Sequence, residues 1–249
     1  MALAEINGAQ LYYETQGDGP PLLLIHAGVA DCRMWDDQID AFSGAYRVIR
    51  FDLRGFGRSD MPPGSFANHE DVRALLDHLD ARPAHVLGIS FGGAIALDFC
   101  LAYPDYVRSL ILGVPSVGGT EPSERIRRFW REEDAALERG DLDGATELNL
   151  RLWVDGPQRN PEQVDGQVRE KVRRMQQAIF RKEIPDDIEE VDLDPPAVEH
   201  LSEIAAPVLI LVGELDLDEK RALANRLAAE ISGAQKLVLP GVAHMLNME

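Results

Sequence analysis

The sequence of 249 residues predicts an α/β fold in which helices cover both faces of a mostly parallel β-sheet. Short runs that are apolar throughout recur along the first 112 residues and again near the end of the chain. Such runs are typical of parallel strands that are buried on both faces. Between residues 120 and 201 these runs disappear, so the chain is expected to contain two kinds of structure.

The expected strands and helices alternate, as parallel strands joined by helical crossovers require. Short, mostly apolar stretches predict strands, and longer stretches with apolar residues three and four positions apart predict helices. The expected strands span residues 10–15, 22–25, 46–51, 85–89, 107–112, 208–212 and 236–239, and the expected helices span residues 68–79, 92–103 and 220–231.

The middle of the chain, residues 120–201, is expected to be a helical insertion in an α/β core formed by residues 1–119 and 202–249. Charged residues dominate this segment, and its apolar residues recur at the spacing of amphipathic helices. A flexible linker is excluded, because linkers seldom carry amphipathic helices that contain tryptophan. The apolar residues at this spacing are Ile126, Phe129, Trp130, Leu148, Leu150, Leu152, Trp153, Val168, Val172, Met175 and Ile179.

The charge of the chain argues against several classes of partner. It carries 25 Lys and Arg residues against 43 Asp and Glu residues, a formal net charge of −18. An acidic surface repels nucleic-acid phosphates and anionic lipids, so neither nucleic-acid binding nor membrane adsorption is expected. No apolar run approaches the ~20 residues that cross a bilayer, and the N-terminus does not resemble a signal peptide. Cys32 and Cys100 show no metal-ligand spacing, which favours a reducing cytoplasm.

The strongest sign of chemistry is the stretch GISFGG at residues 88–93, which lies between an expected strand and an alanine-rich expected helix. A serine in a Gly-x-Ser-x-Gly turn of this kind forms a nucleophile elbow. Gly88 and Gly92 lack the β-carbons that would collide in the tight turn, and Ser90 is pushed out above the sheet. The N-terminus of the following helix supplies donors and the positive end of a dipole. Ser90 is the expected nucleophile, and an incidental glycine-rich turn is the other interpretation.

A serine hydroxyl needs a general base before it can act as a nucleophile. His244 follows the last expected strand, and so would emerge at the carboxyl edge of the sheet, where ligands bind in open α/β folds. It is therefore the expected base. The other histidines lie in less suitable places. His69 and His78 lie on or near a polar, solvent-exposed helix, and His85 begins a strand. His200 lies at the end of the insertion, and His26 lies in a tight loop.

The base must in turn be oriented by an acid, which should also follow a strand. Asp216 lies just beyond the expected strand at residues 208–212, and it completes the chain order Ser, Asp, His. Asp218 and Glu214 are its rivals in the same turn, Asp218 also being suited to cap the next helix. We favour Asp216 over both.

Two backbone N–H groups must face the oxygen that becomes negative when a carbonyl is attacked. One is expected from Phe91, the residue after the serine, and the other from the loop after the strand at residues 22–25. We assign the second to Gly28, with Val29 as the alternative donor. The ring of His26 is expected to hold the shape of this loop and to play no part in catalysis.

Five ordered motifs lie along the chain: HAG at residues 26–28, DLRGFGRS at 52–59, GISFGG at 88–93, GELD at 213–216 and GVAH at 241–244. Together they resemble the α/β-hydrolase superfamily over nearly the whole chain. The resemblance implies a mostly parallel sheet of about eight strands, with a helical cap inserted after the sixth strand, here at residues 120–201. It also implies that the turn at 52–59 is structural.

Within that superfamily, a serine at the elbow argues against haloalkane dehalogenases and epoxide hydrolases, which carry aspartate there. The short cap and the GISFGG elbow look most like small carboxylesterases and the enol-lactone hydrolases. Two features depart from the pattern. Ala27 stands where glycine is common, which bears on the oxyanion-hole assignment. The final C-terminal helix of the superfamily is missing, because only residues 245–249 follow His244, and an exposed apolar patch is expected unless a partner chain covers it.

The expected function is hydrolysis of a small-molecule carboxylic ester or lactone through an acyl-enzyme, without a metal or other cofactor. The same triad also supports other reactions: those of thioesterases, peptidases, carbon–carbon hydrolases, hydroxynitrile lyases and perhydrolases. The alternative from another class is a non-catalytic ligand-binding protein of this fold. Monomer and homodimer are both open. Candidate pocket residues are Val29, Phe129, Trp130 and Trp153, of which the aromatic ones also suit a helix core, and Arg127, Arg128 and Arg151 are candidates to hold a substrate carboxylate.

Overall fold

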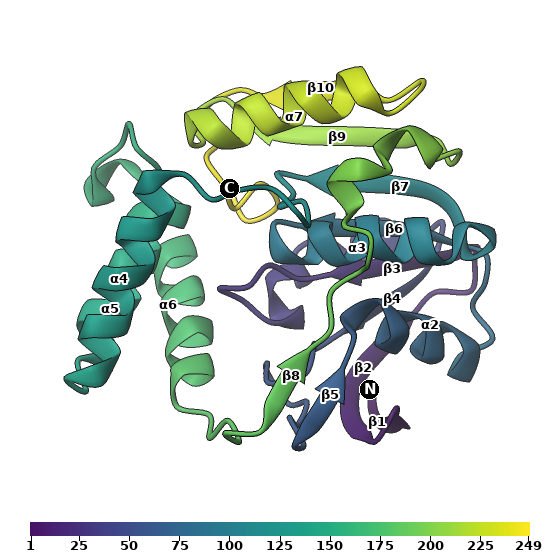
Figure 1. Ribbon diagram of the computed structural model, residues 1–249, viewed down its shortest axis with the longest axis horizontal. Coiled ribbons are helices and arrows are strands. Elements are labelled where there is room, and N and C mark those ends of the chain that lie inside the picture. The colour runs from purple at the N-terminus through teal and green to yellow at the C-terminus, as the bar shows by residue number, and fades with distance from the viewer.

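The computed structural model describes residues 1–249, and its central feature is an eight-stranded sheet with the strand order β1-β2-β4-β3-β6-β7-β9-β10 (Figure 1). β2 alone runs opposite to the other strands of this sheet, pairing antiparallel with both β1 and β4, so the expectation of a mostly parallel sheet is confirmed. The strands of this sheet are β1 (Ala2–Ile6), β2 (Ala9–Gln16), β3 (Pro21–Ile25), β4 (Arg47–Phe51), β6 (Ala84–Ile89), β7 (Val107–Gly113), β9 (Val208–Gly213) and β10 (Gln235–Leu239).

The central strands form because their side chains are apolar on both faces of the sheet. Leu23, Leu24 and Ile25 of β3 are completely buried, and β3 lies between β4 and β6 in parallel register. A strand without polar side chains gains from burial on either face and cannot serve as a solvent-exposed edge. The sheet is thereby fixed at its centre, where the strands that lead to the candidate site lie.

Helices cover one face of this sheet: α2 (Asn68–His78), α3 (Phe91–Ala102) and α7 (Asp218–Glu230), which lie in front of it in Figure 1. The opposite face is covered by shorter pieces, η1 (Cys32–Trp35), α1 (Ile39–Ser43) and the buried residues of the C-terminal segment. In that segment Met245, Leu246 and Met248 pack into the core. The second face is therefore covered less completely than the first.

No helix follows β10, in agreement with the sequence. Leu237 and Val238 of this edge strand are 50% and 45% exposed, and Leu209 and Leu211 of β9 are half-buried. Apolar side chains are thus exposed at this edge of the sheet.

Between β7, the sixth strand of the main sheet along the chain, and β9 lie three helices that stand together at one end of the sheet (Figure 1). They are α4 (Glu124–Glu138), α5 (Leu142–Asn149) and α6 (Gly166–Phe180), and a π-helical turn, η3 (Leu150–Asp155), continues α5. The segment is not helical throughout: β8 (Ile188–Glu190) pairs with β5 (Gly64–Phe66) in a second, two-stranded sheet. That residues 120–201 form a separate cap domain stays a prediction.

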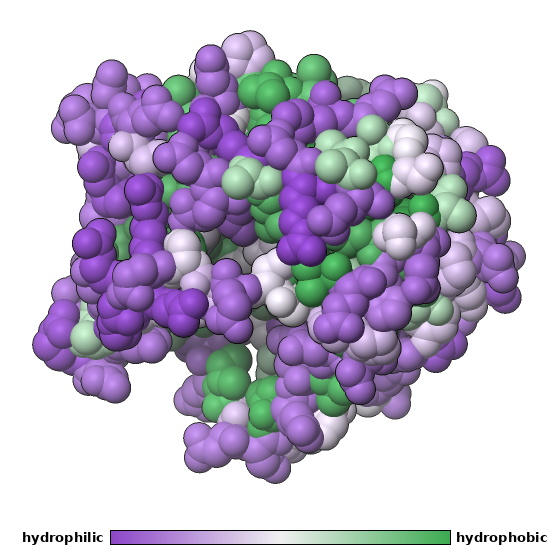
Figure 2. All heavy atoms as spheres, turned by 45° about the horizontal axis from the view of Figure 1, so that its top comes forward, coloured by the Kyte–Doolittle hydropathy of each residue, from purple (hydrophilic) through white to green (hydrophobic).

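Hydrophilic side chains cover most of the face shown in Figure 2, and hydrophobic ones gather there in smaller groups. None of the helices combines the length and the apolar character that crossing a membrane requires. The cytoplasmic location stays a prediction.

Candidate active site

Ser90 lies at a strained turn between β6 and α3. Its backbone has φ 55° and ψ −113°, a conformation that residues with a β-carbon seldom adopt. The glycines on either side make the turn possible. A β-carbon on Gly88 would lie 2.1 Å from the carbonyl oxygen of Gly92, and one on Gly92 would lie 2.4 Å from that of Ile25. The turn presents the serine hydroxyl at the carboxyl end of β6.

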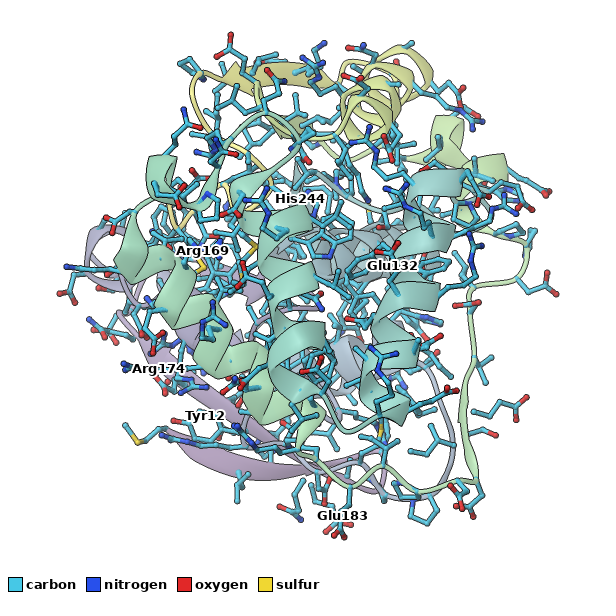
Figure 3. The ribbon with its side chains drawn as sticks, turned by 90° about the vertical axis from the view of Figure 1, so that its left-hand side faces the viewer. Tyr12, Glu132, Arg169, Arg174, Glu183 and His244 are labelled. Carbon is cyan, nitrogen blue, oxygen red and sulfur yellow. The ribbon has the colours of Figure 1, made fainter.

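His244 and Asp216 meet Ser90 at this edge of the sheet. The Nε2 atom of His244 lies 2.8 Å from Oγ of Ser90, and its Nδ1 atom lies 2.8 Å from Oδ2 of Asp216. The backbone N–H of Leu217 donates to the other carboxylate oxygen of Asp216, at 2.7 Å. Both His244 and Asp216 are 1% exposed, so this hydrogen-bonded chain is shielded from water except at the serine. In Figure 3 His244 lies behind the helices of residues 124–180.

The rivals of Asp216 have other partners. Asp218, the first residue of α7, pairs with Arg221, and Glu214 accepts a hydrogen bond from the backbone N–H of Gly241. Neither is bonded to a histidine. Of the three acids in this turn, the structure brings only Asp216 to His244.

The two expected oxyanion-hole donors lie next to each other. A β-carbon built on Gly28 would be 3.5 Å from the β-carbon of Phe91. The backbone N–H groups of both residues have no hydrogen-bond acceptor within the protein, and the same is true of Val29. The structure thus leaves donors free beside Ser90 and does not choose between Gly28 and Val29.

His26 is built into the loop that carries Gly28. Its Nδ1–H donates to the carbonyl of Ala27 at 2.9 Å, and its Nε2 accepts from the backbone N–H of Leu53 at 3.0 Å. Burial lowers the pKa of His26, although the nearby Asp52 carboxylate opposes the shift. A neutral ring with both nitrogens bonded to backbone suits the structural role that the sequence suggests. The other histidines are bonded elsewhere or lie outside the site, and His69, expected to be exposed, is half-buried.

A cavity of about 980 Å³ opens above Ser90 and His244. All the residues proposed from the sequence as pocket residues line it, although Trp130 is 47% exposed and lies at its rim. The core contributes Gly28, Val29, Ser90, Phe91, Ser116, Lys220 and His244, and the inserted helices contribute Ile126, Phe129, Trp130, Trp153, Ile179 and Phe180.

Trp153 connects the inserted helices to the edge of the sheet where Ser90 and His244 lie. Its ring centroid lies 4.6 Å from that of His244, and the ring of Phe129 meets it edge-on at 5.8 Å. Trp153 lies in the π-helical turn η3, and such turns often occur at functional sites. The aromatic residues therefore serve both the pocket and the packing of the insertion.

Two polar residues of the site, Lys220 and Ser116, were missed by sequence reasoning. Nζ of Lys220 donates to Oγ of Ser116 at 2.9 Å, and the backbone N–H of Ser116 donates to the carbonyl of Ser90 at 3.2 Å. No motif contains them. The position of Ser116 just after a strand, β7, and of Lys220 at the start of the helix after Asp216 are the signals that could have found them.

A cluster of metal-binding residue types, Asp31, Cys32 and Asp52, lies in the segments that follow β3 and β4. Its carboxylates already accept hydrogen bonds: Asp31 from Arg33, and Asp52 from the backbone N–H groups of Cys32 and Arg58. Burial raises the pKa of the Cys32 thiol, so the thiolate that binds metals is disfavoured. These contacts suit a structural turn better than a metal site.

Several proteins whose sequences are similar to this chain are named as hydrolases. A zearalenone hydrolase of Cladophialophora bantiana is 28% identical over 176 residues, which cover 66% of this chain and 64% of that protein. A soluble epoxide hydrolase of Corynebacterium is 36% identical over 112 residues, 44% of this chain and 39% of that protein. The chain thus spans less than two thirds of the length of the curated relatives it matches.

Solved structures match over nearly the whole chain. A thermophilic esterase from Thermogutta terrifontis has a TM-score of 0.80 and 25% identity, covering 100% of this chain and 93% of its own. A hydrolase from Pseudomonas aeruginosa has a TM-score of 0.79 and 27% identity, covering 99% and 92%. An enol-lactonase from Burkholderia xenovorans, at 23% identity and a TM-score of 0.77 over 98% and 93%, shares the fold.

These matches confirm the resemblance drawn from the five motifs. The family described as having the alpha/beta hydrolase fold matches residues 20–249, all but the first strands of the chain. The chain belongs to the α/β-hydrolase family.

Proposed function

We propose that the protein is a serine hydrolase that cleaves a small carboxylic ester or lactone through an acyl-enzyme intermediate. The observation that carries the proposal is the hydrogen-bonded chain from Ser90 through His244 to Asp216, at the floor of a cavity. A serine, an imidazole and a carboxylate in this order form the arrangement that activates a hydroxyl for attack on a carbonyl.

In the first half-reaction Oγ of Ser90 forms a bond to the carbonyl carbon of the substrate, and its proton passes to Nε2 of His244, 2.8 Å away. The carbonyl oxygen becomes an oxyanion. When the carbonyl re-forms, the bond to the leaving oxygen breaks and His244 returns the proton to that oxygen. An alcohol leaves from an ester, whereas in a lactone the hydroxyl end stays attached to the acyl group.

In the second half-reaction water takes the place of the alcohol. His244 removes a proton from the water as it attacks the acyl carbon, and the carboxylic acid leaves when Oγ of Ser90 takes the proton back. Asp216 holds the imidazole in the tautomer with a proton on Nδ1, and it stabilises the imidazolium that forms twice in each cycle.

The free backbone N–H groups of Phe91 and of Gly28 or Val29 are the donors for the oxyanion. They need not break a bond inside the protein to reach it, because they have no acceptor there. Donors that are already in place cost no reorganisation when the charge develops. Ala27, which replaces the usual glycine, donates its own N–H to the sulfur of Met34 at 3.3 Å, so the departure leaves these groups free.

The cavity supports a small substrate with apolar parts. We propose that residues 120–201 act as a cap, since α4, α6 and η3 supply much of its apolar lining. The serine at the elbow separates this chain from the aspartate-dependent chemistry of epoxide hydrolases, and the whole-chain similarity to a thermophilic esterase agrees with ester hydrolysis.

The test is covalent labelling with a fluorophosphonate, followed by mass spectrometry of the labelled peptide. The wild type should be labelled at Ser90 and should hydrolyse p-nitrophenyl esters. Ser90→Ala should lose both, with kcat falling by a factor on the order of 10⁶. Ser65→Ala, an exposed serine on β5, should retain both.

Normal ester hydrolysis by a folded Ser90→Ala protein would contradict the mechanism. Failure of the wild type to react, with retained binding of an ester, would favour a ligand-binding protein. A panel of esters, lactones, thioesters and amides of graded acyl length then distinguishes the chemistries that share this triad, and we expect the highest kcat/KM for an ester or lactone.

A further inference from the structure

Lys220 is a cation inside the cavity, close to the reacting groups. It projects from the start of α7, and its Nζ donates to Ser116, the residue whose backbone N–H is bonded to the carbonyl of Ser90. Nζ also lies 5.9 Å from the ring centroid of Trp153, whose ring packs on His244. Lys220 is thus linked to both the nucleophile and the base through one residue each.

The other charged groups that line the cavity have partners. Glu219, next to Lys220, accepts from the hydroxyl of Ser123 at 2.8 Å. Glu133 accepts from the side-chain amide of Asn149. The remaining pairs are Glu121 with Arg127 and Arg226 with Glu230. No carboxylate oxygen lies within 4.0 Å of Nζ of Lys220, so its charge is not compensated by an ion pair.

The ammonium group has three N–H donors. One is used by Ser116, and no other hydrogen bond from Nζ is formed within the protein. Burial lowers the pKa of Lys220, against the influence of the Asp216 and Glu219 carboxylates. An ammonium that lies partly out of water without an anion is costly, and an anion that enters the cavity lowers that cost.

The arginines considered from the sequence are less suitable for an anion. Arg127 and Arg128 are paired with Glu121 and Glu132 at exposed positions. Arg151 is paired with the buried Asp155. None of the three lines the cavity.

We propose that Lys220 is a specificity-determining residue that binds a carboxylate of the substrate. The preferred substrates are then esters or lactones that carry a free carboxylate elsewhere in the molecule, an inference that rests on the proposed function. The two unused donors of Nζ receive the carboxylate oxygens, and Ser116 and Trp153 hold the ammonium in place. A charge-assisted hydrogen bond inside a cavity, away from bulk water, is strong enough to select one substrate over another.

The test compares matched pairs of substrates. For a carboxylate on the acyl side, the pair is mono-4-nitrophenyl adipate and its methyl ester. For a carboxylate on the alcohol side, the pair is 4-acetoxybenzoate and its methyl ester. The ratio of kcat/KM for the anionic member to that for the neutral member measures the preference, and the pair with the larger ratio identifies the side that carries the carboxylate.

We expect the wild type to favour the anionic member of at least one pair, and Lys220→Met to lower that ratio about tenfold or more. Lys220→Arg keeps the charge and should retain part of the preference. Lys236→Met makes the same change in net charge at an exposed position on β10, outside the cavity, and should leave the ratio unchanged. If Lys220→Met does not fold, Lys220→Gln provides the same comparison.

A binding measurement separates this proposal from the proposed hydrolysis. Calorimetric titration of monomethyl adipate into Ser90→Ala requires no turnover, and the affinity should fall about tenfold or more when Lys220→Met is added. A ratio that Lys220→Met leaves unchanged in both pairs, or an affinity that does not depend on Lys220, would overturn the carboxylate site even if Ser90 proved essential. If Lys220→Met lost the preference but a folded Ser90→Ala protein still hydrolysed esters normally, only the Ser90 mechanism would be overturned.

Discussion

The main sheet and the inserted helices are held together by different forces. Along β3, β6 and β7 nearly all the apolar side chains of the sheet are buried. The inserted helices carry a network of ion pairs: Arg169 binds Asp155 at 2.6 Å and Glu147 at 2.7 Å, and Arg173 binds Glu147 at 2.7 Å. The first kind of packing tolerates few changes in shape, whereas the second depends on charge.

This difference matches what each region supplies to the site. Ser90, Asp216 and His244 all follow strands of the main sheet, and their geometry is fixed by the strand ends and by tight glycine turns. The inserted helices supply a wall of the cavity, mostly aromatic and aliphatic. We infer that the strand ends determine the chemistry, and that the insertion, together with Lys220 of α7, determines which molecules are bound.

Apart from the loss of Ser90 itself, the largest effect should come from a change in the sheet region that leaves the shape intact. In Asp216→Asn, the amide no longer holds His244 in the tautomer that accepts the serine proton. We expect kcat for p-nitrophenyl esters to fall by a factor on the order of 10⁴, while circular dichroism shows an unchanged fold.

The neighbouring acids provide matched controls. Asp218→Asn and Glu214→Gln remove a carboxylate from the same turn without touching His244, so kcat should stay near the wild-type value. A larger loss in either control than in Asp216→Asn would show that the acid is wrongly assigned.

Sequence patterns predicted the sheet region well, because buried parallel strands and strained turns leave few choices of residue. The runs that became β3, β6 and β9 contain no Asp, Glu, Lys or Arg, and the run that became β7 contains only Arg108. The elbow needs glycine on both sides of Ser90. The order of these elements placed Ser90, Asp216 and His244 at one edge of the sheet. Physical constraints that act on neighbouring residues are visible in a sequence.

The features that the sequence did not reveal depend on contacts between distant segments. β5 and β8 are short and partly polar, and they become strands only because they pair across more than a hundred residues. Nothing in the sequence around Lys220 shows that its side chain turns into a cavity. The π-helical turn that directs Trp153 toward His244 has no sequence signature either.

A smaller effect is expected from the ion-pair network of the insertion. Asp155 is completely buried and accepts hydrogen bonds from Arg169 and Arg151. Asp155→Asn keeps the volume but leaves Arg169 without its buried partner. We expect the free energy of unfolding to fall by about 3–5 kcal/mol, measured by urea denaturation.

An exposed pair on the same helix is the control. Glu170 pairs with Arg174 at the surface of α6, whereas Arg169 binds the buried Asp155. Figure 3 labels both arginines. Glu170→Gln should leave the unfolding curve nearly unchanged, because exposed pairs contribute little. Equal effects of the two substitutions would show that the insertion does not depend on buried charge.

The smallest effect concerns the boundary between the two regions. Asp98 on α3 has an oxygen without a hydrogen-bond partner. Burial, with help from the negative charges of Asp192 and Glu190 in the inserted segment, raises the pKa of Asp98 to about 7. The unfolded chain ionises this group near its ordinary value of about 4. The stability that the neutral acid provides is therefore complete below about pH 4, and it is lost as the pH rises to about 7.

Asp98→Asn resembles the neutral acid at every pH, so its advantage over the wild type should grow between pH 5 and 7 and stay constant above pH 7. We expect its melting temperature to exceed that of the wild type by roughly 2–6 °C at pH 8, with a narrower gap at pH 5. Asp105→Asn, at an exposed position just beyond α3, should show no such trend. A gap that is the same at pH 5 and pH 8 would mean that Asp98 is already ionised in the folded protein at pH 5, and that the inserted segment tolerates a third negative charge at this boundary.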